Sequence, residues 1–417
     1  MTEDHKLAKV DILIQQNKFD EAERLLSDLL AQDSNNVYML SLLAEIKLQQ
    51  DNYPQASRII NNAIGLSPDT AYLFFIKSRI DLQQENLKNA EKYINEAIRL
   101  DPYEADYFAL LANIHIIRKQ FKEGLETTNR ALEIDAQNIL AINMRSTALN
   151  KLNRSEEAFA TIEGALREDP NNPYTHSNYG WGLLEKGDHK KALEHFKEAL
   201  SQDPNYMYAQ SGMLEALKAS NPVYRMFLKY AFFMSNITGK YQWGVIIGFY
   251  LGFRFLGRLA RNNEGLQPFL YPVLIVLALI AFSTWVITPI SNLFLRFNKY
   301  GNYLLDKNEK RSSNLVAISF MVFIVGLLLF IILKDVGMLA IAIYGFAMMI
   351  PFGSMFSPAK NNTLQIYTIA LGLIGLISIG ITLTYGEFWN VLTPLFVLGF
   401  VGFQWVANFI LIGEDNY

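Results

Sequence analysis

The histidines are the side chains of this sequence best suited to acid–base or metal chemistry. All five lie before residue 219: His5, His115, His176, His189 and His195. His189 and His195 flank a KKALE segment, but a spacing of six residues puts them on different faces of a helix. Because zinc requires ligands that converge on one point, we interpret both as surface residues and predict no metal site.

Carboxylates and cysteines offer no better candidates for catalysis. The chain has no cysteine, which excludes disulfides, thiolate metal sites and cysteine nucleophiles. In the second half the acids fall in predicted loops, flanks or the tail: Glu264, Asp306, Glu309, Asp335, Glu387, Glu414 and Asp415. This placement argues against a carboxylate pair or a proton relay within a membrane. The sequence also contains no HExxH, P-loop or dinucleotide motif, so we predict neither a catalytic residue nor a cofactor.

Two polar groups remain in the second half of the chain. Gln404 and Asn408 stand one helical turn apart, and we expect them to join packed helices rather than to bind a transported substrate. Arg254, Arg258 and Arg261 form a stripe at helical spacing. These arginines could extend to lipid headgroups, as cations near a membrane surface commonly do, or could recognise a phosphate on a lipid or lipid-linked precursor.

The first half of the chain carries a 34-residue repeat. A small residue recurs at this spacing, at Ala22, Ala56, Ala90, Gly124, Ala158 and Ala192. A second small position precedes it by twelve residues, at Ala44, Ser78, Ala112, Ser146 and Gly180, whereas the first repeat has Val10 there. The pattern predicts six helical hairpins whose helices cross closely at the small residues. Since a lone hairpin cannot bury both of its apolar faces, the hairpins must stack.

Segments such as NYPQASRIINNAIGLSP and DHKKALEHFKEALSQDP resemble the tetratricopeptide-repeat family in their small, aromatic and proline positions. The resemblance covers residues 3–206. It implies an all-α fold in which six 34-residue hairpins form a superhelix with a concave groove. We expect a capping helix at residues 207–219 to close this superhelix. The family also implies binding of a protein or peptide in the groove.

In this family the first helix of each repeat lines the groove. By register, the groove-facing residues are Tyr38, Glu45, Tyr72, Phe75, Arg79, Asp106, Asn113, Asn143, Asn150, Lys151, Tyr174 and Trp181. Their rings and amides suit an extended or helical peptide. The alternative is that several of these side chains pack between neighbouring repeats. The Lys and Asn constellation with which some relatives bind a C-terminal carboxylate is not found in this sequence.

The second half consists of long apolar runs with short polar connections. Five runs without a charged residue are long enough to cross a bilayer of about 30 Å: residues 269–290, 314–333, 336–356, 364–385 and 389–412. A sixth run, 243–259, contains Arg254 and Arg258. It also carries Gly244, Gly248 and Gly252 at a spacing typical of close helix packing.

These patterns predict three parts in chain order. Residues 1–219 form the repeat solenoid, residues 220–241 an amphipathic interfacial linker helix, and residues 242–417 an α-helical transmembrane bundle of about six spans. The connection at 291–313 carries five cations, which marks it as cytoplasmic. Six spans place the solenoid, this connection and the C-terminus on one side, whereas five would put the solenoid outside. We favour six spans in a bacterial inner membrane, with the solenoid and the C-terminus cytoplasmic.

Charge distribution limits the partners. Residues 1–218 carry 24 Lys and Arg against 33 Asp and Glu, and residues 219–417 carry 13 against 7. Because the acidic first half would repel a phosphate backbone, we exclude nucleic acid. We predict a scaffold without enzymatic activity that binds a protein or peptide in its groove and contacts membrane lipids, with other membrane proteins as further candidates. The alternative is a transporter or lipid-processing membrane protein with a regulatory repeat domain.

Overall fold

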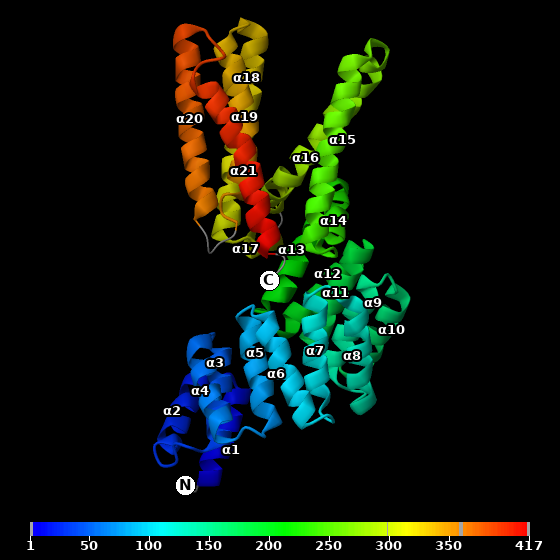
Figure 1. The fold of residues 1–417 in the computed structure, drawn as a ribbon, viewed down its shortest axis with the longest axis vertical. Helices are drawn as coiled ribbons and strands as arrows, with labels where there is room; N and C mark the ends of the chain where they lie inside the picture. The colour runs from blue at the N-terminus through cyan, green and yellow to red at the C-terminus, as the bar shows by residue number, and fades with distance from the viewer. Residues whose placement is uncertain (1–2, 298, 358–361, 415–417) are drawn as a thin grey trace. The chain divides into compact units, whose positions relative to one another are not determined.

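The computed structural model describes residues 3–297, 299–357 and 362–414, which fold into helices joined by short connections (Figure 1). The chain divides between Pro170 and Asn171 into two compact units. Within the described residues the secondary structure is helical throughout. This confirms the all-α fold that the sequence predicts.

Five antiparallel helical hairpins make up the first unit. Their helices pair as α1 (Glu3–Gln15) with α2 (Phe19–Leu30), α3 (Val37–Gln49) with α4 (Tyr53–Leu66), α5 (Ala71–Gln83) with α6 (Leu87–Leu100), α7 (Ala105–Ile117) with α8 (Phe121–Ile134), and α9 (Ile139–Lys151) with α10 (Ser155–Glu168). Asparagines begin several of these helices, because their side-chain oxygens accept an otherwise unpaired backbone N–H. Asn36, Asn52, Asn86 and Asn138 all do so.

The small residues meet where the helices of a hairpin cross. The Ser78 hydroxyl donates to the Ala90 carbonyl at 2.8 Å, and the Ser146 hydroxyl donates to the Ala158 carbonyl at 3.1 Å. Both serines are buried. A hydroxyl on one helix can reach a backbone carbonyl on its partner only when the two backbones approach closely, as the sequence pattern predicts.

Each apolar core in this unit is shared by consecutive hairpins. One cluster joins Leu40 of α3 and Ile60 of α4 to Ile76 of α5, the first helix of the next repeat. A hairpin alone would leave one of these faces in water, at a cost of about 1.5–3 kcal/mol for each large aliphatic side chain. The repeats therefore depend on their neighbours for stability.

The turn inside each hairpin has a left-handed residue at the same place in the repeat. Positive φ angles recur every 34 residues at Asn17, Asp51, Glu85, Lys119 and Asn153, with values of 57° to 62°, and at Gly187 with 95°. This conformation costs about 1–2 kcal/mol for an ordinary L-residue. It recurs because each hairpin needs the same sharp reversal between its helices, whichever side chain stands there.

The second unit begins with the sixth hairpin, α11 (Pro173–Lys186) and α12 (His189–Gln202). The expected capping helix follows as α13 (Met207–Lys218), and α14 (Pro222–Ser235) comes next. The fully buried Phe196 ring lies between Gly180 of α11 and Gly212 of α13. A Cβ atom at these glycines would stand 2.8 and 2.2 Å from the ring, so the ring has no space on either side.

Leucines join the capping helix to the helices that follow. Leu214 and Leu217 of α13 form one apolar cluster with Leu295, at the end of α16 (Gln267–Leu295), and with Leu304 and Leu305 around α17 (Lys299–Leu304). The capping helix therefore shares a core with the end of α16 and with α17.

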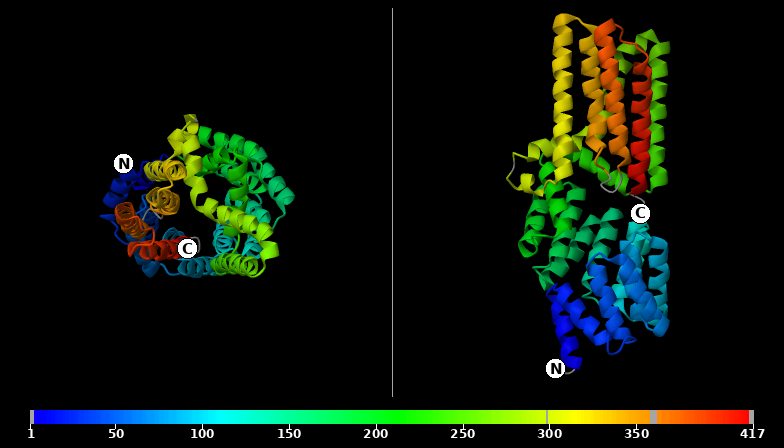
Figure 2. Two further views of the ribbon diagram at one scale, coloured as in Figure 1. Left: turned by 90° about the horizontal axis from the view of Figure 1, so that it is seen from above. Right: turned by 90° about the vertical axis from the view of Figure 1, so that its left-hand side faces the viewer.

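Six helices of this unit are long and apolar enough to cross a membrane. They are α15 (Gly239–Asn262), α16 with its preceding 3-10 turn η1 (Glu264–Leu266), α18 (Lys307–Leu333), α19 (Val336–Ser354), α20 (Thr363–Tyr385) and α21 (Leu392–Glu414). Figure 2 shows α18 to α21 running alongside one another. The run at 243–259, interrupted by arginines, thus lies within one continuous helix.

Helix starts do not coincide with the starts of the apolar runs, and for two helices a capping side chain explains the difference. α18 begins at Lys307, seven residues before the predicted span, because Asp306 and Glu309 form a reciprocal capping box. α21 begins at Leu392 rather than Trp389, because the Asn390 side chain accepts the Leu392 N–H at 3.0 Å. Hydropathy locates the apolar segment, whereas individual capping side chains determine where the helix begins.

The α18–α19 pair packs backbone against backbone. A Cβ atom on Gly345 would lie 2.6 Å from the Phe323 nitrogen, and one on Gly326 would lie 2.7 Å from the Ala342 nitrogen. The Ser319 hydroxyl donates to the Gly345 carbonyl at 2.8 Å. Small residues and an interhelical hydrogen bond are the usual means of close packing between membrane helices.

We expect Gly212→Ala to destabilise the sixth repeat by about 1–3 kcal/mol, because the new methyl group overlaps the confined Phe196 ring. The measurement is denaturant unfolding of the full chain. Gly164→Ala in α10 is the control, since its methyl group meets no atom within 4 Å. Equal stability of the two variants would contradict this packing.

Gly345→Ala should lower the thermal stability of the detergent-solubilised chain, because the α18 backbone cannot move away without breaking the Ser319 hydrogen bond. Gly380→Ala on α20 introduces the same methyl group where no atom lies within 4 Å. A melting temperature lowered only by the first substitution supports the close crossing. An equal shift in both would argue against it.

Candidate functional site

Five side chains gather on the first helices of repeats two to four. Glu45 comes from α3, Tyr72, Phe75 and Arg79 from α5, and Tyr107 from α7. We call these residues the groove patch. Neighbouring first helices pack on one another, α3 on α5 and α5 on α7. Residues one repeat apart are therefore brought side by side, as the 34-residue separation of Glu45 and Arg79 illustrates.

An ion pair lies at the centre of the groove patch. Arg79 Nη1 donates to Glu45 Oε1 at 2.6 Å, and the two side chains are 28% and 19% exposed. The Arg79 guanidinium also lies 5.5 Å from the centre of the Phe75 ring. Partial burial reduces solvent screening, and the ring gives the cation a second contact. Arg79 is thus held in place while part of it still faces solvent.

Aromatic rings extend the groove patch on both sides of Phe75. Tyr72 stacks on Phe75 at 6.1 Å, and the Tyr107 ring lies 5.1 Å from the Phe75 ring. Burial, together with the Glu45 carboxylate, raises the pKa of Tyr72, and burial raises the pKa of Tyr107 to about 12. Both phenols therefore stay protonated at neutral pH. Tyr72, which is exposed, can offer a hydroxyl donor and an apolar ring to a ligand, whereas the buried Tyr107 supports the Phe75 ring from the core side. This is the chemistry of binding rather than of proton abstraction.

The other predicted groove residues of the first unit have different surroundings. Tyr38 and Asp106 are exposed, and Asp106 Oδ1 accepts from Asn138 Nδ2 at 2.6 Å. Asn143 is fully buried, and its amide donates to the Ile139 carbonyl of the same helix at 2.8 Å. Partly buried positions are occupied by Asn113, Asn150 and Lys151. The structure thus brings Glu45, Tyr72, Phe75 and Arg79 together, while Asn143 lies inside the hairpin stack.

Tyr174 and Trp181 lie in the second unit, on α11. The Trp181 indole stacks on Tyr208 at 5.7 Å, meets Phe196 and Phe232 edge to face, and donates to the Tyr208 carbonyl at 3.3 Å. Burial raises the pKa of Tyr174. Trp181 therefore packs against neighbouring helices, which is the alternative that the sequence left open to a role in the groove.

The polar residues of the apolar helices occupy two settings. Arg254, Arg258 and Arg261 are exposed on α15, and Arg261 Nε donates to the Gly257 carbonyl of its own helix at 3.3 Å. Gln404 and Asn408 are partly buried on α21. Contact of the arginines with lipid headgroups stays a prediction.

Sequence reasoning missed Tyr107 and the true partner of His195. Tyr107 directly follows Asp106, the groove-facing position in this repeat, and its side chain is buried. A prediction based on groove-facing positions alone therefore omits it. His195 Nδ1 lies 2.9 Å from His176 Nδ1, across the α11–α12 hairpin. The antiparallel pairing of these two helices is the signal that could have indicated the contact between His195 and His176.

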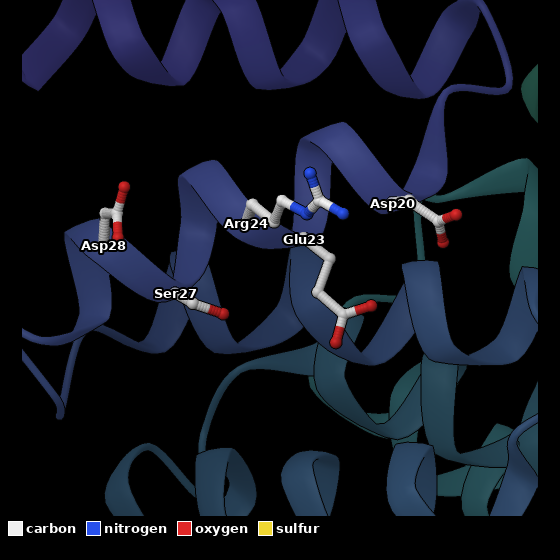
Figure 3. A pocket seen from close by; sticks show the side chains of 5 residues that line it. All are labelled: Asp20, Glu23, Arg24, Ser27 and Asp28. Atoms are coloured by element: carbon white, nitrogen blue, oxygen red, sulfur yellow. The ribbon is translucent and has the colours of Figure 1, made fainter.

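A polar hollow of about 410 Å³ lies on the second helix of the first repeat. All its lining residues come from α2, as Figure 3 shows: Asp20, Glu23, Arg24, Ser27 and Asp28. Lys47 Nζ lies 2.5 Å from Glu23 Oε1, and Gln50 donates to Asp20 Oδ1 at 3.0 Å. A metal site would require three or more histidines or carboxylates close together, and the described residues contain no such group.

Solved structures similar to this chain include tetratricopeptide-repeat proteins. The crystal structure of MamA has 19% identity and a TM-score of 0.33, over 40% of this chain and 91% of that one. YrrB, described as a TPR protein with an unusual peptide-binding site, has 19% identity and a TM-score of 0.32, over 45% and 96%. A tetratricopeptide repeat protein from Parabacteroides merdae has 16% identity and a TM-score of 0.45, over 51% and 82%. No curated protein sequence matches the chain.

Three family models match the chain itself. Each is described as a tetratricopeptide repeat, and they match residues 13–74, 71–104 and 173–206. The matched segments include hairpins of both compact units and agree with the 34-residue register of small residues and left-handed turns. This chain therefore contains tetratricopeptide repeats, matched over residues 13–104 and 173–206.

Proposed function

We propose that this chain is a membrane-anchored adaptor that binds a protein partner on the first-helix face of its repeats. Tetratricopeptide repeats serve in protein interaction, which supports the binding role. In this proposal the apolar helices hold the repeats at a membrane, and the activity is recruitment without covalent chemistry.

The groove patch is the observation that carries the proposal. It presents Tyr72 and Arg79, of two residue types that contribute most to binding energy at protein interfaces, beside the Phe75 ring, which the buried Tyr107 supports. The Arg79–Glu45 ion pair and the stacked rings hold these side chains in position before a ligand arrives. Such preorganisation lowers the entropy lost on binding.

The chemistry of the groove patch suggests what a ligand segment would contain. An aromatic or aliphatic side chain fits against the Tyr72 and Phe75 rings, because it would exchange water for apolar contact. The exposed part of Arg79 suits a carbonyl or carboxylate oxygen of the ligand. We therefore propose a peptide segment that places an apolar side chain beside an acceptor.

The membrane part of the proposal rests on helix length and on charge. Six described helices are long and apolar enough to cross a bilayer. Arg296 and Lys299 lie between α16 and α18, and Lys307, Lys310 and Arg311 lie at the start of α18. This group of cations favours the cytoplasmic side by the positive-inside rule. Six crossings then put the repeats on that same side. The bacterial inner membrane is the proposed location.

We expect Arg79→Glu to reduce partner binding at least tenfold, roughly 1.4 kcal/mol, because it places a carboxylate beside Glu45 and removes the guanidinium from the Phe75 ring. The measurement is the yield of partner crosslinked to the full chain in native membranes. Arg130→Glu on α8 is the matched control, since it breaks an exposed ion pair with Glu133 on a second helix.

A charge swap separates binding from folding. Glu45→Arg combined with Arg79→Glu restores an ion pair across the same contact but reverses its direction. We expect the double variant to regain stability while partner capture stays low, because the ligand would meet the opposite charge at each position. Wild-type capture by both groove variants would contradict the adaptor proposal and favour a transport or lipid-processing role for the apolar half.

Single-cysteine labelling can test the proposed sidedness, because the natural chain contains no cysteine. Tyr103→Cys lies between α6 and α7, Tyr303→Cys in α17 and Tyr385→Cys at the end of α20, all exposed positions. In intact spheroplasts, an impermeant maleimide should label only Tyr385→Cys, and in inverted vesicles it should label the other two. Labelling of Tyr103→Cys from outside would instead support five crossings.

A further inference from the structure

Helix α14 is packed on the last repeat by one of its faces. Tyr224 and Leu228 on this face are buried. Phe232 meets the Trp181 ring edge to face at 6.4 Å, and Asn236, which ends the helix, donates to Glu185 Oε1 at 2.7 Å. These contacts extend from the first turn of α14 to its end.

A buried polar network determines which way α14 faces. Tyr224 Oη donates to Glu215 Oε2 at 2.6 Å, and Lys218 Nζ lies 2.9 Å from Glu215 Oε1 and above the Tyr224 ring. Burial and the Glu215 carboxylate raise the pKa of Tyr224, so its hydroxyl remains a donor. Rotation of α14 about its axis would leave these buried polar groups without partners, which is costly.

The opposite face of α14 presents a continuous apolar stripe. Its members follow one another at spacings of three, four and three residues: Val223, Met226, Tyr230 and Phe233, which are 61%, 75%, 41% and 56% exposed. Lys229 is exposed beside this stripe, at the edge toward Gly187 of the last repeat. An aliphatic and aromatic stripe with a lysine is typical of helices that lie in the headgroup layer of a bilayer.

The charge and position of α14 indicate what covers this stripe. From Glu215 to Glu264 the sequence contains no other acidic residue, whereas Arg225, Lys229 and Lys240 all fall near α14. Only three residues separate the end of α14 from α15, the first helix able to cross a membrane. A second copy of the chain would bring like charges together, whereas anionic phosphates would neutralise them.

We infer that the outer face of α14 lies in the headgroup layer of the membrane that α15 and α16 cross, against anionic lipid. This inference rests on the proposed membrane insertion of those two helices. It makes α14 a bridge with two binding faces: the inner face holds the capping helix α13 through Tyr224 and the sixth repeat through Phe232, and the outer face holds lipid. The sixth repeat is then attached to the membrane surface by side-chain contacts in addition to its covalent link.

Depth-dependent quenching tests the inference on the full chain. Met226→Cys and Phe233→Cys, each labelled with an environment-sensitive fluorophore, report on the outer face. Leu279→Cys, exposed near the middle of α16, reports on membrane insertion. Tyr103→Cys, exposed between α6 and α7, is the control for a label that stays in water. The labelled chains are reconstituted in phosphatidylcholine and phosphatidylglycerol vesicles, with and without lipids brominated near the start of the acyl chains.

We expect bromolipid to remove roughly half of the fluorescence at positions 226 and 233, quenching at 279 as well, and no quenching at 103. Omitting phosphatidylglycerol should weaken the quenching at 226 and 233 only. Quenching at 279 with none at 226 and 233 would overturn the inference and leave membrane insertion intact. No quenching at 279 would overturn the insertion proposal, and this inference with it. The label at 226 could instead show blue-shifted emission without quenching, and lose that shift when the protein is diluted. This result would indicate contact with a second copy of the chain, which also contradicts the inference.

Discussion

A helical hairpin of this repeat buries both of its apolar faces only against other hairpins. The cores of the first unit are accordingly shared, as when Leu40, Ile60 and Ile76 from three successive helices enter one cluster. Close crossing inside each hairpin makes this stacking regular, since the small residues let the backbones meet. Regular stacking in turn aligns the first helices, so residues 34 positions apart become neighbours. The Arg79–Glu45 ion pair is a direct product of that alignment.

The same constraint operates at the end of the repeats. A last hairpin needs a covering element, and α13 supplies it by confining the Phe196 ring between two glycines. Leu214 and Leu217 on α13 then join the ends of α16 and α17, so the cap is also the first contact with the apolar helices. Capping and attachment are therefore performed by one helix, and α14 adds a second set of contacts to the same repeat.

Much of this architecture could be predicted from the sequence. The period of small residues determines the number and the register of the hairpins, and the uncharged apolar runs locate the candidate spans. Helix ends were less predictable, because they depend on single capping side chains: Asp306 and Glu309 before one apolar run, and Asn390 at the start of another.

The candidate site was predictable only in part. Register placed Glu45, Tyr72, Phe75 and Arg79 on one face, which is where they meet. Register alone could not show that Asn143 is buried or that Trp181 is packed by Tyr208 and Phe232, because those outcomes depend on neighbours outside the repeat pattern. The two-faced packing of α14 depends likewise on tertiary contacts.

We propose that the first-helix face of the repeats binds a protein while the chain is in its membrane. Site-specific photocrosslinking in living cells tests it most directly, with the photoreactive residue placed either at Tyr38 on the first-helix face or at Tyr103 in the α6–α7 turn. Both positions are exposed. The account predicts a discrete adduct from position 38 that is absent from position 103. The same adducts from both positions, or none from position 38, would contradict it.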